Sequence, residues 1–195
     1  KWRNERTQGP VEWTLNSDES MTVKPRTGGI ETIEEHGSVQ LHIEWKPPTV
    51  SKGEGQGRGN SGSLFQRRYE VQVLDSYQNR TYSNGQAGSI YKQYSPLVNA
   101  MHPNGEWQVY DIVFNAPEFN EEGEEVKPGS FIVFHNGVLI QNAVELQGTT
   151  EYIGKPKKGR DVMPGYADDK VNHRTLLLQD HGDLVSYRNI WMRKL

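Results

Sequence analysis

The chain has 195 residues, a formal net charge of −3, 20 glycines, 10 prolines and no cysteine. The lack of cysteine excludes disulfides, a thiolate nucleophile and Cys-ligated zinc. The small negative charge argues against a general nucleic-acid binder or a surface that seeks anionic lipid. No apolar run reaches the ~18 residues that a transmembrane helix needs. This length suits one domain with a sizeable core, so residues 1–195 are treated as a single domain.

Strands dominate the expected elements in the first part of the chain. Residues 38–45, SVQLHIEW, alternate apolar and polar side chains, and residues 67–74, RRYEVQVL, do the same. This period of two is the signature of a strand with one buried face. Residues 106–114, EWQVYDIVF, are apolar on both faces, which predicts a central strand covered on both sides.

The second part of the chain contains the clearest hairpin. Residues 130–146, SFIVFHNGVLIQNAVEL, place two β-rich runs around Asn136-Gly137, a pair that type I′ turns favour. Two further strands are expected in 174–182 and 184–195. Residues 115–129 and 147–172 have the composition of long polar loops, the first of them acidic, and the only helical turn is expected in SPLVNAM, residues 95–101.

Many strands with turn signals between them, and no persuasive helix, predict an all-β fold. The connections favour an antiparallel sandwich or barrel, because parallel strands would need helical crossovers between them. No internal repeat and no second-domain boundary is evident in the sequence.

Residues 57–62, GRGNSG, match the G-x-G-x-x-G pattern of dinucleotide-binding loops. That motif works only between a strand and a helix, where the pyrophosphate sits on the helix N-terminus. Here a polar loop precedes the glycines, and a strand pattern follows them. The sequence therefore argues against a dinucleotide site, and the glycines need another explanation.

Polar residues on the expected strand 69–75 are candidates for chemistry. Glu70 and Gln72 point to one face about 7 Å apart, and Asp75 ends the run. Paired carboxyls that face one bond are the usual equipment for cleaving a glycoside, although a solvent-facing polar row has the same pattern. If Glu44 shares a sheet with Glu70, the two like charges would raise one pKa.

Residues 179–182, Gln-Asp-His-Gly, end a later strand with a tight turn. His181 is a candidate base near neutral pH, or else an exposed turn residue beside an Asp180 cap. Glu70, Gln72, Asp75 and a water would form an oxygen-rich site able to hold Ca²⁺ or another divalent cation. The acidic residues 118–125 match no calcium-loop spacing, and charge runs of this kind are usually solvated.

Four blocks in order closely resemble the 3-keto-disaccharide hydrolase family: GQGRGNSGSLFQRRYEVQVLDSY, GQAGSIYKQYSPLVNAMHPNGEWQVYDIVFNAP, FHNGVLIQNAVEL and LLLQDHGDLVSYRNIWMRKL. The resemblance runs from about Trp13 to Leu195 and departs only in the opening segment. It implies a concanavalin-like jelly roll with a concave polar sheet. It also implies a bacterial protein that is exported to the periplasm or cell surface and acts on glycosides.

By the same resemblance, the family's recurrent polar positions correspond to Glu44, Arg58, Asn60, Glu70, Gln72, Asp75, Gln179 and His181. We assign His181, Glu70 and Asp75 as candidate catalytic residues, with a slight preference for His181 as the base. The others are candidate substrate-binding residues, together with Tyr91, whose ring could stack on a sugar. The glycines of 55–62 would let the backbone approach the sugar closely.

The expected function is therefore cleavage of glycosidic bonds, with a 3-keto-glycoside as substrate. A ketone at C3 acidifies the hydrogen on C2, so a side-chain base can remove it and the C1 substituent can leave by elimination or hydrolysis. Two alternatives stay open at this point: a carbohydrate-binding module without chemistry, since fold does not settle function, and an ordinary glycosidase that acts on unoxidised glycans.

Overall fold

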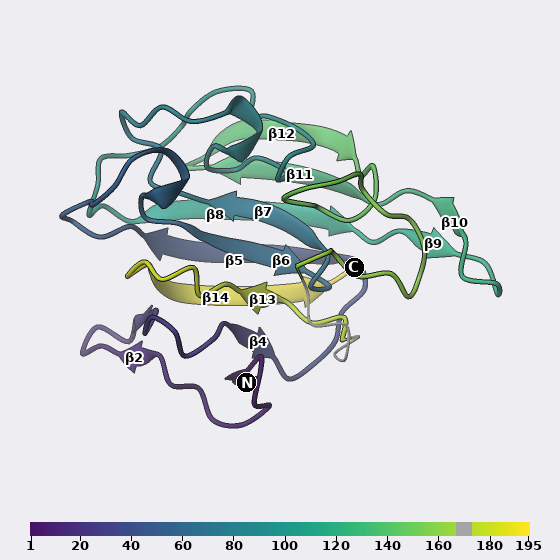
Figure 1. Ribbon diagram of the computed structural model, residues 1–195, viewed down its shortest axis with the longest axis horizontal. Helices are drawn as coiled ribbons and strands as arrows, with labels where there is room; N and C mark the ends of the chain where they lie inside the picture. Colours follow the sequence, from purple (N-terminus) through teal and green to yellow (C-terminus); the bar gives the residue numbers. More distant parts are fainter. Residues whose placement is uncertain (167–172) are drawn as a thin grey trace.

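The computed structural model describes residues 1–166 and 173–195, which form two antiparallel sheets packed face to face (Figure 1). The first has five strands in the order β1 (Trp2–Asn4), β4 (Ile30–Thr32), β13 (Leu177–Leu178), β6 (Ser61–Phe65) and β7 (Tyr69–Val73). The second has seven, in the order β12 (Val138–Glu145), β11 (Ser130–His135), β8 (Gln108–Asn115), β5 (Val39–Lys46), β14 (Ser186–Lys194), β3 (Met21–Thr22) and β2 (Thr14–Leu15). The predicted all-β sandwich is confirmed.

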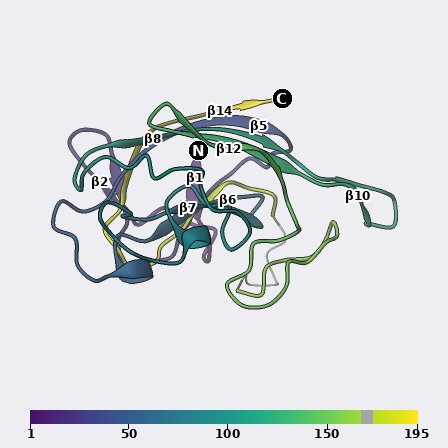
Figure 2. The ribbon, with the colours of Figure 1, turned by 90° about the horizontal axis from the view of Figure 1, so that it is seen from above.

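Figure 2 shows the two layers in profile, with β5, β8, β12 and β14 in one and β1, β6 and β7 in the other. A small hairpin of β9 (Glu118–Phe119) and β10 (Glu125–Lys127) projects from the acidic segment that was expected to be a loop. The described helices are two single 3₁₀ turns, Gly55–Gly57 and Ser83–Gly85. Among the described residues, no helix has the length or apolar character to cross a bilayer.

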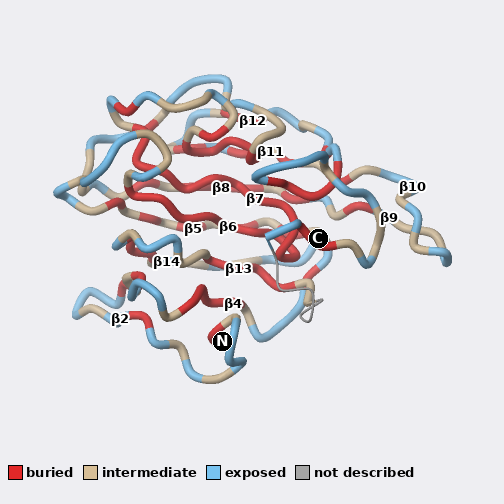
Figure 3. The backbone as a smooth tube through the Cα atoms, viewed as in Figure 1, coloured by how far each residue is buried: buried red, intermediate tan, exposed pale blue. Residues whose placement is uncertain are grey.

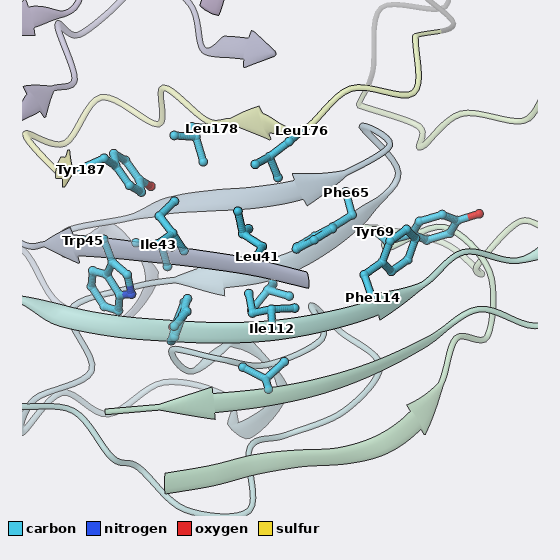
Figure 4. Close-up of a cluster of buried hydrophobic side chains, with 14 of the residues drawn as sticks. Leu41, Ile43, Trp45, Phe65, Tyr69, Ile112, Phe114, Leu176, Leu178 and Tyr187 are labelled. Carbon is cyan, nitrogen blue, oxygen red and sulfur yellow. The ribbon is translucent and has the colours of Figure 1, made fainter. Parts of the chain in front are cut away.

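The core lies between the sheets and is built by the period-two alternation of their strands. In β5 the burial alternates along all eight residues, with Leu41, Ile43 and Trp45 fully buried, as predicted. Figure 4 shows these side chains facing Phe65 and Leu178 of the other sheet. Burying each large apolar side chain contributes roughly 1.5–3 kcal/mol, which makes this alternation the main reason for the sandwich.

Strand β8 differs from its prediction. Only one of its faces is buried in the core, while Val109, Asp111 and Val113 on the other face are half-buried. An antiparallel sheet can leave one face to solvent, and β8 lies within the seven-stranded sheet with β5 and β11 as neighbours. The sequence looks apolar on both faces because Val109 and Val113 lie on this outer, half-buried face.

Of the hairpin turn and the helical turn predicted from the sequence, the structure contains one. The hairpin at Asn136-Gly137 is confirmed, with φ of 51° and 78° at these two residues, as a type I′ turn requires. The helical turn expected in residues 95–101 is wrong. The Leu97 amide instead donates to the carbonyl of Ile140 in β12, and Asn99 Nδ2 donates to the carbonyl of Ser76, so the segment is an irregular loop held against these neighbours.

Strand β7 is buried on both faces (Figure 3), although its sequence predicts one polar face. The segment after β12 runs along the edge of β7, where the Thr150 amide donates to the carbonyl of Arg68 and the Glu70 amide donates to Thr150 Oγ1 at 3.1 Å. Tyr152 and Tyr166 of this segment line the space next to Glu70 and Gln72. The amide of Tyr91 also donates to the Glu70 carbonyl. The polar side chains of β7 therefore face an enclosed space.

Candidate active site

That space is a cavity of ≈ 550 Å³ on the outer face of the five-stranded sheet. Its floor comes from side chains that alternate with core residues on three adjacent strands: Leu64 of β6, Glu70 and Gln72 of β7, and Leu177 and, just after it, Gln179 of β13. Its walls and rim come from the surrounding loops, through Glu5, Arg6, Asn60, Arg67, Tyr91, Tyr152, Tyr166, Asp180 and His181. A cavity of this size suits a small ligand of about two sugar rings.

Glu70 is the ionisable group on the cavity floor. Its side chain is buried, and none of the described residues donates a hydrogen bond to its carboxyl group. Burial disfavours the charged form and raises the pKa of Glu70 to about 8. The carboxyl is therefore largely protonated at neutral pH, and its proton can be gained or lost close to the working range of an enzyme.

Gly62 explains part of the glycine-rich stretch. It pairs with Gln72 across the β6–β7 ladder, so its missing side chain would point into the cavity. A Cβ at this position would lie 2.6 Å from Glu70 Oε1 and 3.1 Å from its Cδ. The notch that this glycine leaves is therefore occupied by the catalytic candidate's own carboxyl group.

Two amide side chains on the floor present buried oxygens that no described residue contacts by a hydrogen bond. Gln72 Nε2 donates to Gln56 Oε1 at 2.9 Å, but among the described residues neither Gln72 Oε1 nor Gln179 Oε1 has a partner. Buried acceptors are nearly always satisfied in folded proteins, by protein, water or ligand. The hydroxyl groups of a bound sugar would donate to these two oxygens.

Tyrosines form much of the cavity wall. The Tyr91 hydroxyl lies 2.7 Å from that of Tyr82, and burial raises the pKa of Tyr91 well above its ordinary value. Lys92 Nζ lies 3.8 Å from the ring centroid of Tyr82 and 5.6 Å from that of Tyr152. Tyr91 therefore stays a neutral hydrogen-bonding group, and the tyrosine rings of the wall offer apolar faces on which a sugar ring can pack.

His181 lies at the rim of the cavity and is exposed. Asp180 next to it fixes the turn, because its Oδ2 accepts from the Gly28 amide and its Oδ1 from the Gly182 amide, both at 3.0 Å. A smaller hollow, shared with Arg6 and Arg26, opens on the other side of His181. His181 can therefore reach the outer part of a ligand, whereas Glu70 reaches the inner part.

Asp75 and Arg58 lie outside the cavity lining. Asp75 is fully buried and accepts from Arg58 Nε at 2.8 Å and from the Ser51 hydroxyl. Gly59 packs against it, with φ of +56° and a notional Cβ only 2.9 Å from Asp75 Cβ. The Asp75–Arg58 pair anchors the glycine-rich loop. Gly59 allows the backbone turn beside this pair, while Gly62 leaves room in the cavity for the Glu70 carboxyl group.

Glu70, Gln72 and Asp75, the side chains expected to bind a divalent cation, do not lie together. Glu70 and Gln72 line the cavity, whereas Asp75 lies outside it and pairs with Arg58. Among residues 1–166 and 173–195, no group of three or more His, Asp or Glu side chains has a metal-binding arrangement. A cation at this site would need ligands other than the three that the sequence suggested.

Glu44 does not lie in the cavity with Glu70, contrary to the prediction from the sequence. Strand β5 belongs to the seven-stranded sheet and β7 to the five-stranded sheet, so Glu44 and Glu70 do not share a face. Glu44 points outward from the sandwich, where its carboxylate accepts from Arg188 Nε at 2.6 Å and from Asn189 Nδ2 at 2.9 Å. The raised pKa of Glu70 therefore comes from burial and not from Glu44.

The other substrate-binding candidates do meet. Asn60, Gln72, Tyr91 and Gln179 all line the cavity with Glu70 and His181. Asn60 is held by its Nδ2, which donates to the Gln56 carbonyl at 2.7 Å. Its backbone amide donates to Asp183 Oδ2 at 2.7 Å, which ties the end of the glycine loop to the segment that follows His181.

Sequence reasoning missed several lining residues, among them Glu5, Arg6, Arg67, Tyr152 and Tyr166. Arg67 sits in the β6–β7 turn with φ of 57°, and its Nη1 donates to Glu31 Oε2 at 2.6 Å. No periodic pattern marks such a turn residue. The aromatic residues inside the polar 147–172 segment were a signal, because a purely solvated loop has little use for exposed tyrosines. Residues 167–172 of that predicted loop lie outside the described residues.

A protein-family model matches nearly the whole chain. It describes the 3-keto-alpha-glucoside-1,2-lyase-like domain and covers residues 1–193. No curated protein matches the chain. A crystal structure of a "putative glycosyl hydrolase" from Parabacteroides distasonis ATCC 8503 is 44% identical, with a TM-score of 0.90 over 100% of this chain and 78% of that one.

Two further structures from the same organism, described in the same words, are more distant. One is 17% identical with a TM-score of 0.64 over 100% of this chain and 88% of that chain. The other is 19% identical with a TM-score of 0.59 over 100% of both chains. At these identities the two structures support the fold.

Proposed function

Because the chain belongs to the 3-keto-alpha-glucoside-1,2-lyase-like family, we propose that it is a carbohydrate-active enzyme that cleaves 3-keto-glycosides by elimination. The observation that carries this proposal is the buried Glu70 carboxyl on the floor of a sugar-sized cavity, with its pKa raised to about 8. A base of this strength is matched to removing a proton from carbon at near-neutral pH.

The reaction begins at C2 of the oxidised sugar. The Glu70 carboxylate takes the C2 hydrogen, which the C3 ketone has acidified, and the electron pair forms the C1–C2 double bond. The C1–O bond breaks, and the departing oxygen takes a proton. Water then adds across the double bond, with hydroxide on C1 and a proton on C2, so that the net reaction is hydrolysis.

The positions of Glu70 and His181 suggest how the two proton transfers are divided. Glu70 is buried at the floor and His181 is exposed at the rim. A ligand with its oxidised ring inside would place C2 near Glu70 and its leaving group near His181. We therefore assign the base to Glu70, in place of the initial preference for His181, and give His181 the role of proton donor to the leaving oxygen.

The neutral polar groups hold the ring. Gln72 and Gln179 have unpaired buried oxygens that accept from sugar hydroxyls, and Tyr91 contributes a neutral hydroxyl and a ring face. None of these groups carries charge, which suits a substrate that is itself uncharged. The negative charge that develops on the C3 oxygen would be met by the Tyr91 hydroxyl acting as a hydrogen-bond donor.

The test compares oxidised and unoxidised disaccharides side by side, with the Glu70→Gln and His181→Ala variants. We expect turnover of the 3-keto substrate only, and a loss of roughly 10²–10⁴ in rate for Glu70→Gln. In deuterated water, elimination and hydration place solvent deuterium on C2 of the released sugar. A no-enzyme control corrects for slow exchange of the ketone. Product without excess deuterium at C2 would refute the elimination.

Two further expectations belong to this proposal. A requirement for a divalent cation, whose three expected ligands do not lie together, is tested by activity after exhaustive chelation together with elemental analysis of the protein. Export to the periplasm or cell surface, expected from the family resemblance, is tested by fractionating cells that express the full-length gene product.

A further inference from the structure

The outer face of the seven-stranded sheet carries a row of side chains that the cavity does not use. Cross-strand pairing places Trp191 of β14 opposite His42 of β5, His42 opposite Asp111 of β8, and Asp111 opposite Phe134 of β11. Figure 2 shows this layer on the side of the sandwich away from β6 and β7. The row therefore lies on the opposite face of the molecule from Glu70.

Two aromatic rings stand at the ends of this row. Trp191 is 45% exposed and Phe134 is 38% exposed, which is high for such large apolar side chains. Three inter-strand spacings separate them, so the row spans about 14 Å. Within the row, the two rings are separated by the polar side chains of His42 and Asp111.

The polar centre of the row is ordered. The ring of His42 stacks on Trp191 with an interplanar angle of 7° and a centroid distance of 5.4 Å. His42 Nδ1 lies 2.7 Å from Asp111 Oδ1, and the Asp111 side chain is 45% exposed, so its second oxygen remains available to a ligand. The stack fixes the orientation of Trp191, and among the described residues no other aromatic ring contacts it.

A local irregularity in β14 builds this arrangement. The register shifts between Arg188 and Trp191, and Asn189 at the shift has φ of +46°, an uncommon conformation for a residue other than glycine. Its Nδ2 donates to Glu44 Oε1 at 2.9 Å and lies 3.3 Å from His42 Nε2. Bulges of this kind re-aim side chains and are common beside binding sites.

An ion pair lies beside the row. Arg188 Nε donates to Glu44 Oε2 at 2.6 Å, and the Arg188 guanidinium also lies 4.0 Å from the ring centroid of Trp107. Because the two charges of this pair offset each other, they do not favour an ionic ligand. An aromatic ring beside fixed hydrogen-bonding groups instead suits a neutral ring that has one apolar face and a rim of hydroxyls.

We propose that the row Trp191–His42–Asp111–Phe134 is a second carbohydrate-binding surface, which holds a neutral polysaccharide across the strands. Sugar rings would pack on Trp191 and Phe134 while hydroxyls donate to Asp111. This surface would tether the protein to a glycan and would leave the chemistry to the cavity. The proposal concerns binding only and does not depend on which substrate the cavity cleaves.

The test is affinity electrophoresis of the intact protein in gels that contain soluble starch, laminarin, xylan or mannan. We expect at least one polysaccharide to retard the protein. The dissociation constant for that polysaccharide should be at least 10-fold larger for Trp191→Ala and for Asp111→Ala than for the wild-type protein. Val126→Ala, a similarly exposed apolar truncation elsewhere, is the matched control and should bind normally. Glu70→Gln should also bind normally, because it changes the cavity alone.

Three results would overturn this proposal. The first is no retardation by any of the four polysaccharides. The second is retardation that Glu70→Gln abolishes and Trp191→Ala does not, which would assign the binding to the cavity. The third is sedimentation showing a dimer that Trp191→Ala dissociates, which would make this face a contact between two copies. Circular dichroism and melting curves establish that both variants are folded before binding is compared.

Discussion

Gly62→Ala is the sharpest test of the candidate active site, because it adds one methyl group directly against the Glu70 carboxyl. The new Cβ would lie 2.6 Å from Glu70 Oε1 and 3.1 Å from both Glu70 Cδ and Leu64 Cδ1. Its backbone φ lies outside the left-handed region, so alanine is compatible with the backbone there. The change therefore acts on the position of the carboxyl and leaves the path of β6 intact.

The size of the effect follows from these distances. An ordinary van der Waals contact needs about 3.4 Å, so the carboxyl oxygen must retreat by about 0.8 Å. A displacement of roughly 1 Å in a catalytic group can cost about 10²-fold in rate. The carboxyl is the far end of a flexible side chain, so the strain on the fold is small, and the loss of unfolded-state freedom from glycine offsets some of it.

The assay measures kcat and KM on a 3-keto-disaccharide together with the melting temperature. We expect Gly62→Ala to lower kcat by about 10–100-fold while the melting temperature changes by only a few degrees. Gly57→Ala is the matched control, because a Cβ there meets no atom within 4 Å, and it should keep full activity. Full activity in Gly62→Ala would refute the role of Glu70 at this position, and a loss shared equally by Gly57→Ala would show that the loop as a whole is responsible.

Three further predictions follow from the same residues. If Glu70 is the base, kcat/KM should rise with pH and level off above about pH 8, and a profile that falls through this range would make Glu70 an acid. Because the pKa of Glu70 is about 8 in the folded protein and near 4.5 when exposed, the folded protein holds a proton that the unfolded chain loses between these values. The free energy of unfolding should therefore fall as pH rises from 4.5 to 8, by on the order of 5 kcal/mol. Chemical denaturation of Glu70→Gln should lack this slope, so an unchanged slope would contradict the burial argument. Asp75→Asn should destabilise the protein by about 3–5 kcal/mol, because Arg58 loses its buried partner, and a melting temperature equal to that of the wild type would place Asp75 in a role other than anchoring the loop.

The sequence by itself determined the elements whose physics is local. The alternation in residues 39–45 predicts a strand with one buried face because side chains on a strand point to opposite faces. Asn136-Gly137 predicts the hairpin because both residues tolerate positive φ. The strand pattern after Gly62 likewise excludes a helix, and with it the phosphate site of a dinucleotide-binding loop. The family resemblance then added the sandwich and the candidate polar positions.

Only the tertiary structure decided which polar residues meet. A period of two shows that Glu44 and Glu70 each lie on a polar face, but it cannot show that these faces belong to different sheets, since sheet membership depends on pairing between distant strands. The same holds for burial: Glu70 looks solvent-facing in its strand, but Tyr152 and Tyr166 line the cavity around it, in a segment that also contacts the Glu70 amide through Thr150, some 80 residues later. The raised pKa of Glu70 is a consequence of that long-range contact, because desolvation depends on everything that surrounds a group and not on its neighbours in the chain.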